Sequence, residues 1–161
     1  MFVYITYDRY ERDEWYSISH IETNKKRAIK HFLEEDLPDF ISYGPDDCHS
    51  FQLQRVQMTK EEYKRLCELV NKEDHAEFDE GEEGELKKIL IDIFDKCNWG
   101  DEDIIIFTDG CSDNVDLIEF YCAQHGIAPD DEDAIDEVEN LLNDDTDLYE
   151  ETLRQYISAT Y

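Results

Sequence analysis

The residues best placed for chemistry lie between Ile106 and Asn114, where an apolar run gives way to a polar turn and then to a helical pattern. The thiol of Cys111 falls where that helix begins, and a cysteine at a helix N-terminus can ionise and act as a nucleophile. The thiolate would need a base, and five histidines are available: His20, His31, His49, His75 and His125. Nothing in their positions brings one of them to Cys111.

The alternative interpretation of this segment is structural: its polar side chains, Asp109, Ser112 and Asp113, turn the chain and cap the helix. The chain has no phosphate-binding loop, no dinucleotide fingerprint and no nucleophile elbow. We therefore predict that the protein is not an enzyme. A small enzyme that uses Cys111, or a metal held by carboxylates, remains the weaker alternative.

A zinc site is the next chemistry to test, and its only ligand set is scattered along the chain: Cys97, Cys111, Cys122 and His125. Structural zinc sites bring their ligands in closely spaced pairs, and only Cys122 and His125 form one. The acidic segments do not follow the ligand pattern of a calcium-binding EF-hand loop. We therefore expect no cofactor and no stoichiometric metal.

Carboxylates are the most abundant functional groups. The segment from Asp130 to Glu151 holds 12 acids and no base, and its apolar residues keep a helical spacing, which places the acids on the outer faces of two helices. Unpaired neighbouring carboxylates destabilise a compact fold, so retaining so many suggests that their field is used. The predicted partner-binding acids are Asp130, Asp131, Asp133, Asp136, Glu137, Asp144, Asp145 and Asp147. The alternative is a coat that only keeps the protein soluble.

The charge is unevenly divided. Residues 73–161 hold 29 acids against four bases, whereas residues 1–72 hold 14 acids and 11 bases, within a total net charge of −28. Such a surface repels phosphates, which excludes direct binding to nucleic acid or to an anionic membrane. No apolar run is long enough for a membrane span. Five scattered cysteines without an export signal indicate reduced thiols and a cytoplasmic location.

The elements that must position these groups indicate an α+β fold. Residues 1–72 predict a near-neutral ββαβα module with a small sheet and helices on one face: strands over 2–7, 15–21 and 51–58, a helix from Thr23 or Asn24 to Glu35, and a helix after the capping box Thr59–Glu62. The connection 36–50, with Pro38, reads as a long and functional loop. The apolar phase changes between Leu53 and Val56, which predicts a bulge.

Residues 73–85, rich in acids and poor in apolar side chains, mark the expected module boundary. Residues 86–161 then predict a mainly helical, strongly acidic half with one short strand over 103–107. Its helices are expected over about 86–97, over 114–125 with Gly126 as C-cap, over 131–142, and after Thr146 as N-cap. The alternative is that the two modules pack as one domain.

Aromatic side chains near the start suggest a second contact surface. Half of those on a three-stranded sheet face outward, and Tyr and Trp anchor many protein interfaces. The candidates for partner binding are Tyr10, Trp15 and Tyr16. Packing of the acidic half over them is the equal alternative.

The stretch Glu102–Ile106, followed by Asp109, Asp113, Asp116, Tyr121 and Gly126, resembles an acidic strand–helix segment of the ArdA antirestriction proteins. Those proteins are similarly long and acidic, and they act as elongated dimeric mimics of B-DNA that occupy the DNA groove of restriction–modification enzymes. The resemblance covers residues 102–126 only, and the N-terminal ββαβα half does not follow the family. It implies DNA mimicry alone, and it assigns no functional residue. Whether the chain forms a homodimer is left open.

The sequence therefore predicts an acidic, non-enzymatic inhibitor of phage or mobile-element origin. Its expected partner is a protein with a basic nucleic-acid-binding surface, of the restriction or CRISPR type. The chief alternative is an acidic adaptor or immunity-type protein whose partner has a basic patch unrelated to nucleic acid.

Overall fold

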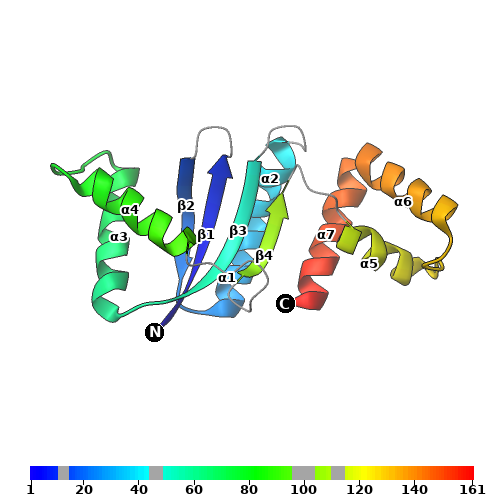
Figure 1. Cartoon of the computed structure of the whole chain (residues 1–161), viewed down its shortest axis with the longest axis horizontal. Helices are drawn as coiled ribbons and strands as arrows, with labels where there is room; N and C mark the ends of the chain where they lie inside the picture. The colour runs from blue at the N-terminus through cyan, green and yellow to red at the C-terminus, as the bar shows by residue number, and fades with distance from the viewer. Residues whose placement is uncertain (11–14, 44–48, 96–103, 110–114) are drawn as a thin grey trace. The chain divides into compact units, whose positions relative to one another are not determined.

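The computed structural model describes residues 1–10, 15–43, 49–95, 104–109 and 115–161 (Figure 1). The chain forms two compact units, Met1–Gly110 and Cys111–Tyr161. The first contains a four-stranded antiparallel sheet with helices, and the described part of the second is helical. The predicted α+β class is confirmed, including strands at the start of the chain and a mainly helical acidic half with one strand.

The sheet is built from β1 (Phe2–Tyr10), β2 (Trp15–Glu22), β3 (His49–Gln57) and β4 (Ile104–Asp109), in the order β2-β1-β3-β4. The register between β3 and β4 shifts between Leu53 and Gln54, whose partners are Ile106 and Ile104, so Ile105 is the extra residue and this bulge lies on β4. β3 itself pairs with β1 without a shift, so the bulge predicted within the third strand from the change of apolar phase is wrong. A second irregularity lies between β1 and β2, where Thr6 pairs with His20 and Tyr7 with Ile18. Ser19 is therefore the extra residue of a bulge on β2.

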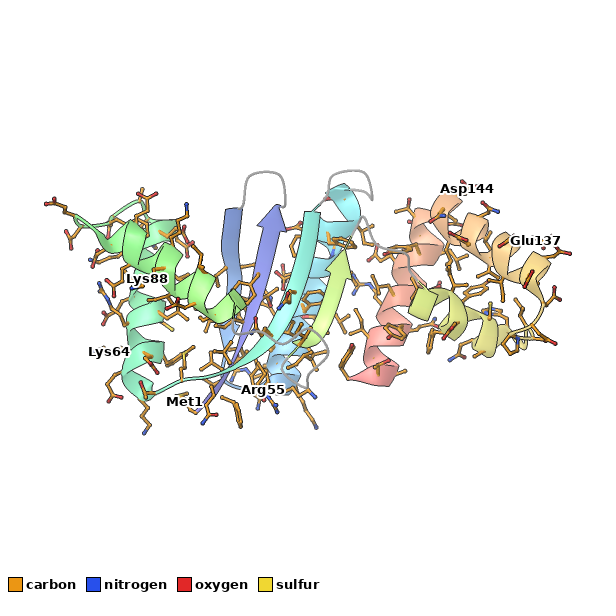
Figure 2. All side chains as sticks on the ribbon, viewed as in Figure 1. Met1, Arg55, Lys64, Lys88, Glu137 and Asp144 are labelled. Carbon is orange, nitrogen blue, oxygen red and sulfur yellow. The ribbon has the colours of Figure 1, made fainter. Side chains whose placement is uncertain are left out.

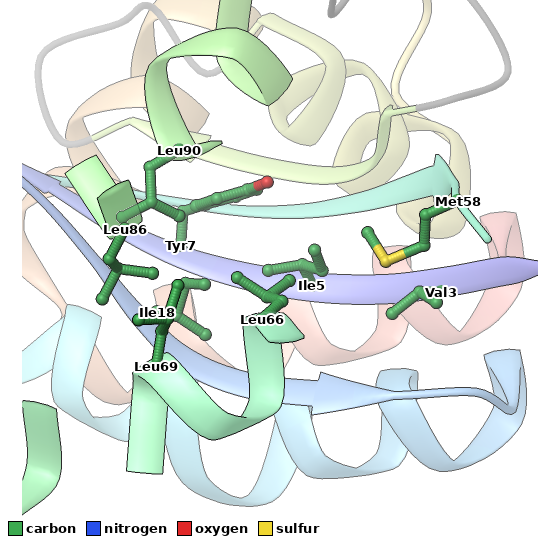
Figure 3. Packing of buried hydrophobic residues seen from close by; sticks show 9 residues of the cluster. All are labelled: Val3, Ile5, Tyr7, Ile18, Met58, Leu66, Leu69, Leu86 and Leu90. Carbon is green, nitrogen blue, oxygen red and sulfur yellow. The ribbon is translucent and has the colours of Figure 1, made fainter. Parts of the chain in front are cut away.

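One face of the sheet is covered by α3 (Lys60–Asp74) and α4 (Glu82–Asp95). Alternate residues of β1 point to this face, because successive side chains of a strand project in opposite directions. They form a core with both helices, and Figure 3 shows the cluster: Val3, Ile5, Tyr7, Ile18, Met58, Leu66, Leu69, Leu86 and Leu90.

Helices also cover the opposite face, so the expectation of helices on one face only is wrong. Phe51 pairs in register with Asp8 of β1, whose side chain is directed away from the Val3 and Ile5 face, and the Phe51 ring meets Phe40 edge-on at 5.7 Å. Phe40 belongs to α2 (Leu37–Tyr43), which follows α1 (Lys25–His31). The two faces of the sheet are thus buried by helices from different parts of the chain.

The connection over 36–50 was predicted to be a long loop, and this is wrong for the residues up to Tyr43. A π-helical turn over Phe32–Asp36 joins α1 to α2, and the Leu37 N–H donates to the Phe32 carbonyl. Pro38 then falls in the first turn of α2, where a missing N–H is tolerated. Leu37 and Phe40 are buried, and the burial of these apolar side chains stabilises the helical conformation beyond Asp36. Residues 44–48 lie outside the described ranges.

The predicted caps around the first unit are confirmed. Asn24, one of the two expected caps of α1, accepts a hydrogen bond from the Arg27 N–H at 3.2 Å. Thr59 and Glu62 form the capping box of α3: the Glu62 N–H donates to Thr59 Oγ1 at 3.2 Å and the Thr59 N–H donates to the Glu62 carboxylate at 2.7 Å.

The acidic segment 73–85 covers the end of α3, the turn that follows and the start of α4, all inside the first unit. Its acids suggested a boundary, but several of them bind cations of α3. Lys72 donates to Glu82 at 2.6 Å and to Asp79 at 2.9 Å, and Arg65 donates to Glu82 at 3.1 Å. These hydrogen bonds, that from Lys72 most of all, lower the pKa of Glu82 to about 2. The division between units falls instead at Gly110.

The second unit consists, in its described part, of α5 (Val115–His125), α6 (Glu132–Asp144) and α7 (Thr146–Thr160). Gly126 has φ 68° and follows α5, and the Ile127 N–H donates to the Cys122 carbonyl at 2.9 Å, which confirms the predicted C-cap. The N-cap of α7 is Asp145 and not Thr146 as predicted, because Asp145 Oδ1 accepts from the Leu148 N–H at 3.0 Å.

Candidate functional site: the acidic face of α6

The carboxylates of α6 lie on one side of the helix. Its buried residues, Val138 and Leu142, are four apart and face the other helices of the unit. At 100° per residue the six acids of α6 fall within an arc of about 160° on the opposite side. These acids are Glu132, Asp133, Asp136, Glu137, Glu139 and Asp144, and all are exposed. Figure 2 shows Glu137 and Asp144 on the outer side of α6.

The spacing of these charges is close to that of a nucleic-acid strand. At a rise of 1.5 Å per residue, the 13 residues of α6 extend for about 20 Å, or roughly one carboxylate per 3.3 Å. One strand of B-DNA carries a phosphate charge per about 3.4 Å of axis. The face therefore has about the linear charge density of one DNA strand, over a little more than half of a helical turn of about 34–36 Å.

This charge is hardly compensated within its own unit. Residues 111–161 contain one arginine and no lysine. That arginine, Arg154, donates to the Glu150 carboxylate at 2.7 Å, one turn earlier on α7. The first unit differs, because there Arg65 and Lys72 bind acids of the α3–α4 turn.

The eight acids predicted to bind a partner are all exposed, but two of them also cap the N-termini of helices. Asp131 Oδ1 accepts from the Ala134 N–H at 3.2 Å and caps α6, and Asp145 caps α7. A carboxylate bound to a helix N-terminus is less available to a partner. The other six acids, which are not the N-cap of α6 or α7, are Asp130, Asp133, Asp136, Glu137, Asp144 and Asp147.

The aromatic candidates are placed by their backbones alone. Tyr10 pairs with Trp15, and Tyr16 pairs with Arg9, at the C-terminal end of β1 and the N-terminal end of β2. All three aromatics are therefore neighbours at one end of the sheet. Their side chains lie outside the described residues, so their role in binding stays a prediction.

The residues considered for metal or nucleophilic chemistry are only partly described. Cys97 and Cys111 lie outside the described ranges, whereas Cys122 is buried in α5 and His125 is exposed at its end. Among the described residues, no group of three or more His, Cys, Asp or Glu side chains is arranged to hold a metal ion.

A polar cluster that sequence reasoning missed lies where α1 passes into the π-helical turn. The buried Asp36 carboxylate is 3.2 Å from Nδ1 of His31, and His31 stacks on His20 of β2. Burial raises the pKa of Asp36, while hydrogen bonds from Ser19 and His31 act in the opposite direction. No sequence pattern announces this cluster, because it depends on a π-turn and on the β2 bulge.

None of the helices in the described ranges combines the length and the apolar character needed to cross a membrane.

No protein-family model matches this chain, and neither a curated protein nor a solved structure matches it significantly.

Proposed function

We propose that this protein is a non-enzymatic inhibitor that uses the acidic face of α6 to occupy a basic, nucleic-acid-binding surface of another protein. The observation that carries the proposal is the charge density of that face, which equals that of one DNA strand and has almost no cation in its own unit. A surface made of lysines and arginines that binds phosphates also binds carboxylates at the same spacing.

The resemblance to ArdA proteins adds an expected class of partner. It suggests a restriction or CRISPR type of nucleic-acid-binding protein, a phage or mobile-element origin and a dimeric assembly. The five scattered cysteines suggest a cytoplasmic site of action. Direct binding to nucleic acid or to an anionic membrane does not fit a net charge of −28.

The test uses purified restriction enzymes and CRISPR effector complexes as probes. Binding of labelled duplex DNA to each of them is measured by fluorescence anisotropy as this protein is added. We expect displacement of DNA from at least one, weakened by added salt because the contacts are ionic.

The decisive variant neutralises the six acids that cap no helix, by Asp→Asn and Glu→Gln changes at Asp130, Asp133, Asp136, Glu137, Asp144 and Asp147. This variant should lose inhibition while circular dichroism stays unchanged. The matched control makes the same changes at six exposed acids of the first unit: Glu35, Asp39, Asp74, Glu77, Glu80 and Glu83. It should inhibit like the wild type. Equal inhibition by both variants would reduce the acidic face to a solubility coat.

An acidic adaptor for a basic surface unrelated to nucleic acid is the competing function. The same assay separates the two, because an adaptor's complex with its partner is not displaced by excess duplex DNA.

A further inference from the structure

A pocket of about 320 Å³ lies between α5 and α7, inside the second unit. Its polar lining comes from both helices: Tyr121, Gln124 and His125 of α5, and Glu151, Thr152 and Gln155 of α7. The volume is at the lower limit of the roughly 300–1,000 Å³ typical of ligand pockets. It suits one side chain or a small ligand.

An aromatic platform forms one wall of this pocket. The His125 ring stacks on the Tyr121 ring, with centroids 4.0 Å apart and planes 19° from parallel. Nδ1 of His125 lies 2.9 Å from the Tyr121 carbonyl, and because a carbonyl can only accept, Nδ1 carries the proton. The stack is thereby fixed in orientation, and in the neutral ring Nε2 is an acceptor.

Two side chains of the lining donate hydrogen bonds within α7. Thr152 Oγ1 donates to the Leu148 carbonyl at 2.7 Å, and Gln155 Nε2 donates to Glu151 Oε1 at 3.2 Å. The one acid of the lining is Glu151, whose carboxylate acts only as an acceptor when it is ionised. The lining contains no lysine or arginine. A complementary ligand is a cation with several N–H donors and a flat face.

We propose that this pocket binds the guanidinium group of an arginine presented by the partner protein. A guanidinium is planar, carries five N–H donors and no acceptor, stacks on aromatic rings and pairs with carboxylates through two parallel hydrogen bonds. The ammonium of lysine matches the charge but neither the plane nor the number of donors. This proposal rests on the proposed function and adds to it one specific contact.

The pocket supplies what the acidic face lacks. Each exposed ion pair between a carboxylate of this face and a lysine or arginine of the partner contributes only about 0–1 kcal/mol. A face that binds through such pairs alone discriminates poorly between basic partners. A partly enclosed arginine is a typical hot spot of protein interfaces. An inhibitor with such an anchor selects partners whose basic surface presents an arginine at the right place.

The test titrates the full chain, without any partner, with three blocked tripeptides, Gly-Arg-Gly, Gly-Lys-Gly and Gly-citrulline-Gly, and follows backbone amide resonances by NMR. The arginine peptide should shift resonances around Tyr121, Gln124 and Glu151 and bind at least about fivefold more tightly than the lysine peptide. Citrulline, which keeps the shape but not the charge, should not bind. Equal binding of lysine and arginine, or no shift in α5 and α7, would overturn the proposal.

Glu151→Gln provides the matched variant, because the amide keeps the acceptor for Gln155 and removes the charge. It should weaken binding of the arginine peptide at least about fivefold. Glu83→Gln makes the same change at an exposed acid of the first unit, outside the pocket and the acidic face of α6, and should bind the peptide like the wild type. The titration contains no partner protein, so its result is independent of the DNA-displacement test. Absence of peptide binding would overturn the arginine pocket alone, and absence of DNA displacement would overturn the proposed function alone.

Discussion

The imidazole rings of His20 and His31 lie face to face, with centroids 3.6 Å apart and planes within 2° of parallel. Two positive charges at that separation repel strongly, so the stack holds only one readily. Asp36 offers its carboxylate to His31. Burial, and then the neighbouring His31, lower the pKa of His20 from its ordinary 6.5, although Asp36 and Glu22 act in the opposite direction and Arg27 in the same one.

The first prediction concerns stability against pH. In the unfolded chain His20 binds its proton near pH 6.5, whereas the folded chain resists it, so acidification through that range favours unfolding. His20→Phe keeps a flat ring and removes this effect. Compared with wild type, the variant should gain at most about 1 kcal/mol of unfolding free energy between pH 7.5 and pH 5, because partial exposure screens the ring.

Urea denaturation at a series of pH values measures this difference. His75→Phe, at the exposed end of α3, is the control and should follow the wild-type pH profile. If the unfolding free energy of His20→Phe had the same pH dependence as that of the wild type, the fold would not lower the pKa of His20, and the prediction would be wrong.

The second prediction concerns the ion pairs that Lys72 and Arg65 of α3 form with Glu82 of α4, here called the α3–α4 clamp. The pKa of Glu82 is lowered to about 2 from 4.5, chiefly by Lys72, so its contribution to stability is present above pH 4.5 and is lost as the pH falls towards 2. Glu82→Gln should therefore destabilise the protein at neutral pH, with a difference from wild type that shrinks on acidification. Thermal denaturation at several pH values is the measurement. Glu83→Gln, next to it and exposed, should have little effect, and equal losses for both variants would contradict the clamp.

The third prediction separates capping from surface charge in the acidic segment. Asp145→Ala removes the acceptor for the Leu148 N–H and should cost about 1 kcal/mol. Asp144→Ala removes another exposed acid, which lies both at the C-terminal end of α6 and just before α7. The unfavourable and favourable helix-dipole contributions of its charge oppose each other, so the variant should stay close to wild type in stability. Chemical denaturation of the two variants side by side tests this, and the cap assignment fails if they are equally stable.

The fourth prediction concerns salt. The carboxylates of α6 repel one another, and the Debye length falls from about 30 Å at 0.01 M to about 10 Å at 0.1 M ionic strength. The melting temperature should rise over that range, and it should rise less in the six-acid variant of the second unit than in its first-unit control. Calorimetry at matched pH decides it. A flat wild-type curve would mean that the charges are already compensated.

Much of the fold follows from local patterns in the sequence. The capping box at Thr59 and Glu62, the cap at Asn24 and the turn at Gly126 each depend on a few adjacent residues, and all were predictable. The helix over Leu37–Tyr43 was not, because Pro38 reads as a helix breaker unless a π-turn shifts the hydrogen-bond register before it. The placement of helices on both faces of the sheet depends on long-range packing, which no local pattern encodes.

The candidate site likewise has features that a local sequence pattern predicts and features that it does not. Periodicity alone places the acids of α6 opposite Val138 and Leu142, and the structure agrees. The pocket beside Tyr121 and Glu151 needs two helices, α5 and α7, to lie together, so neither sequence segment signals it. The capping role of Asp145 was missed because Thr146, one residue later, is an equally good cap by type.

The position of β4 at the edge of the sheet has a consequence for how the chain is made. β1, β2 and β3 are complete once residue 57 has been synthesised, but the partner of β3's free edge starts at Ile104. At about 5–20 residues per second, translation leaves that edge without β4 for roughly 2–9 s. An open strand edge is a template for pairing with other chains. Those seconds are therefore the interval in which the nascent chain can misassociate through the edge of β3.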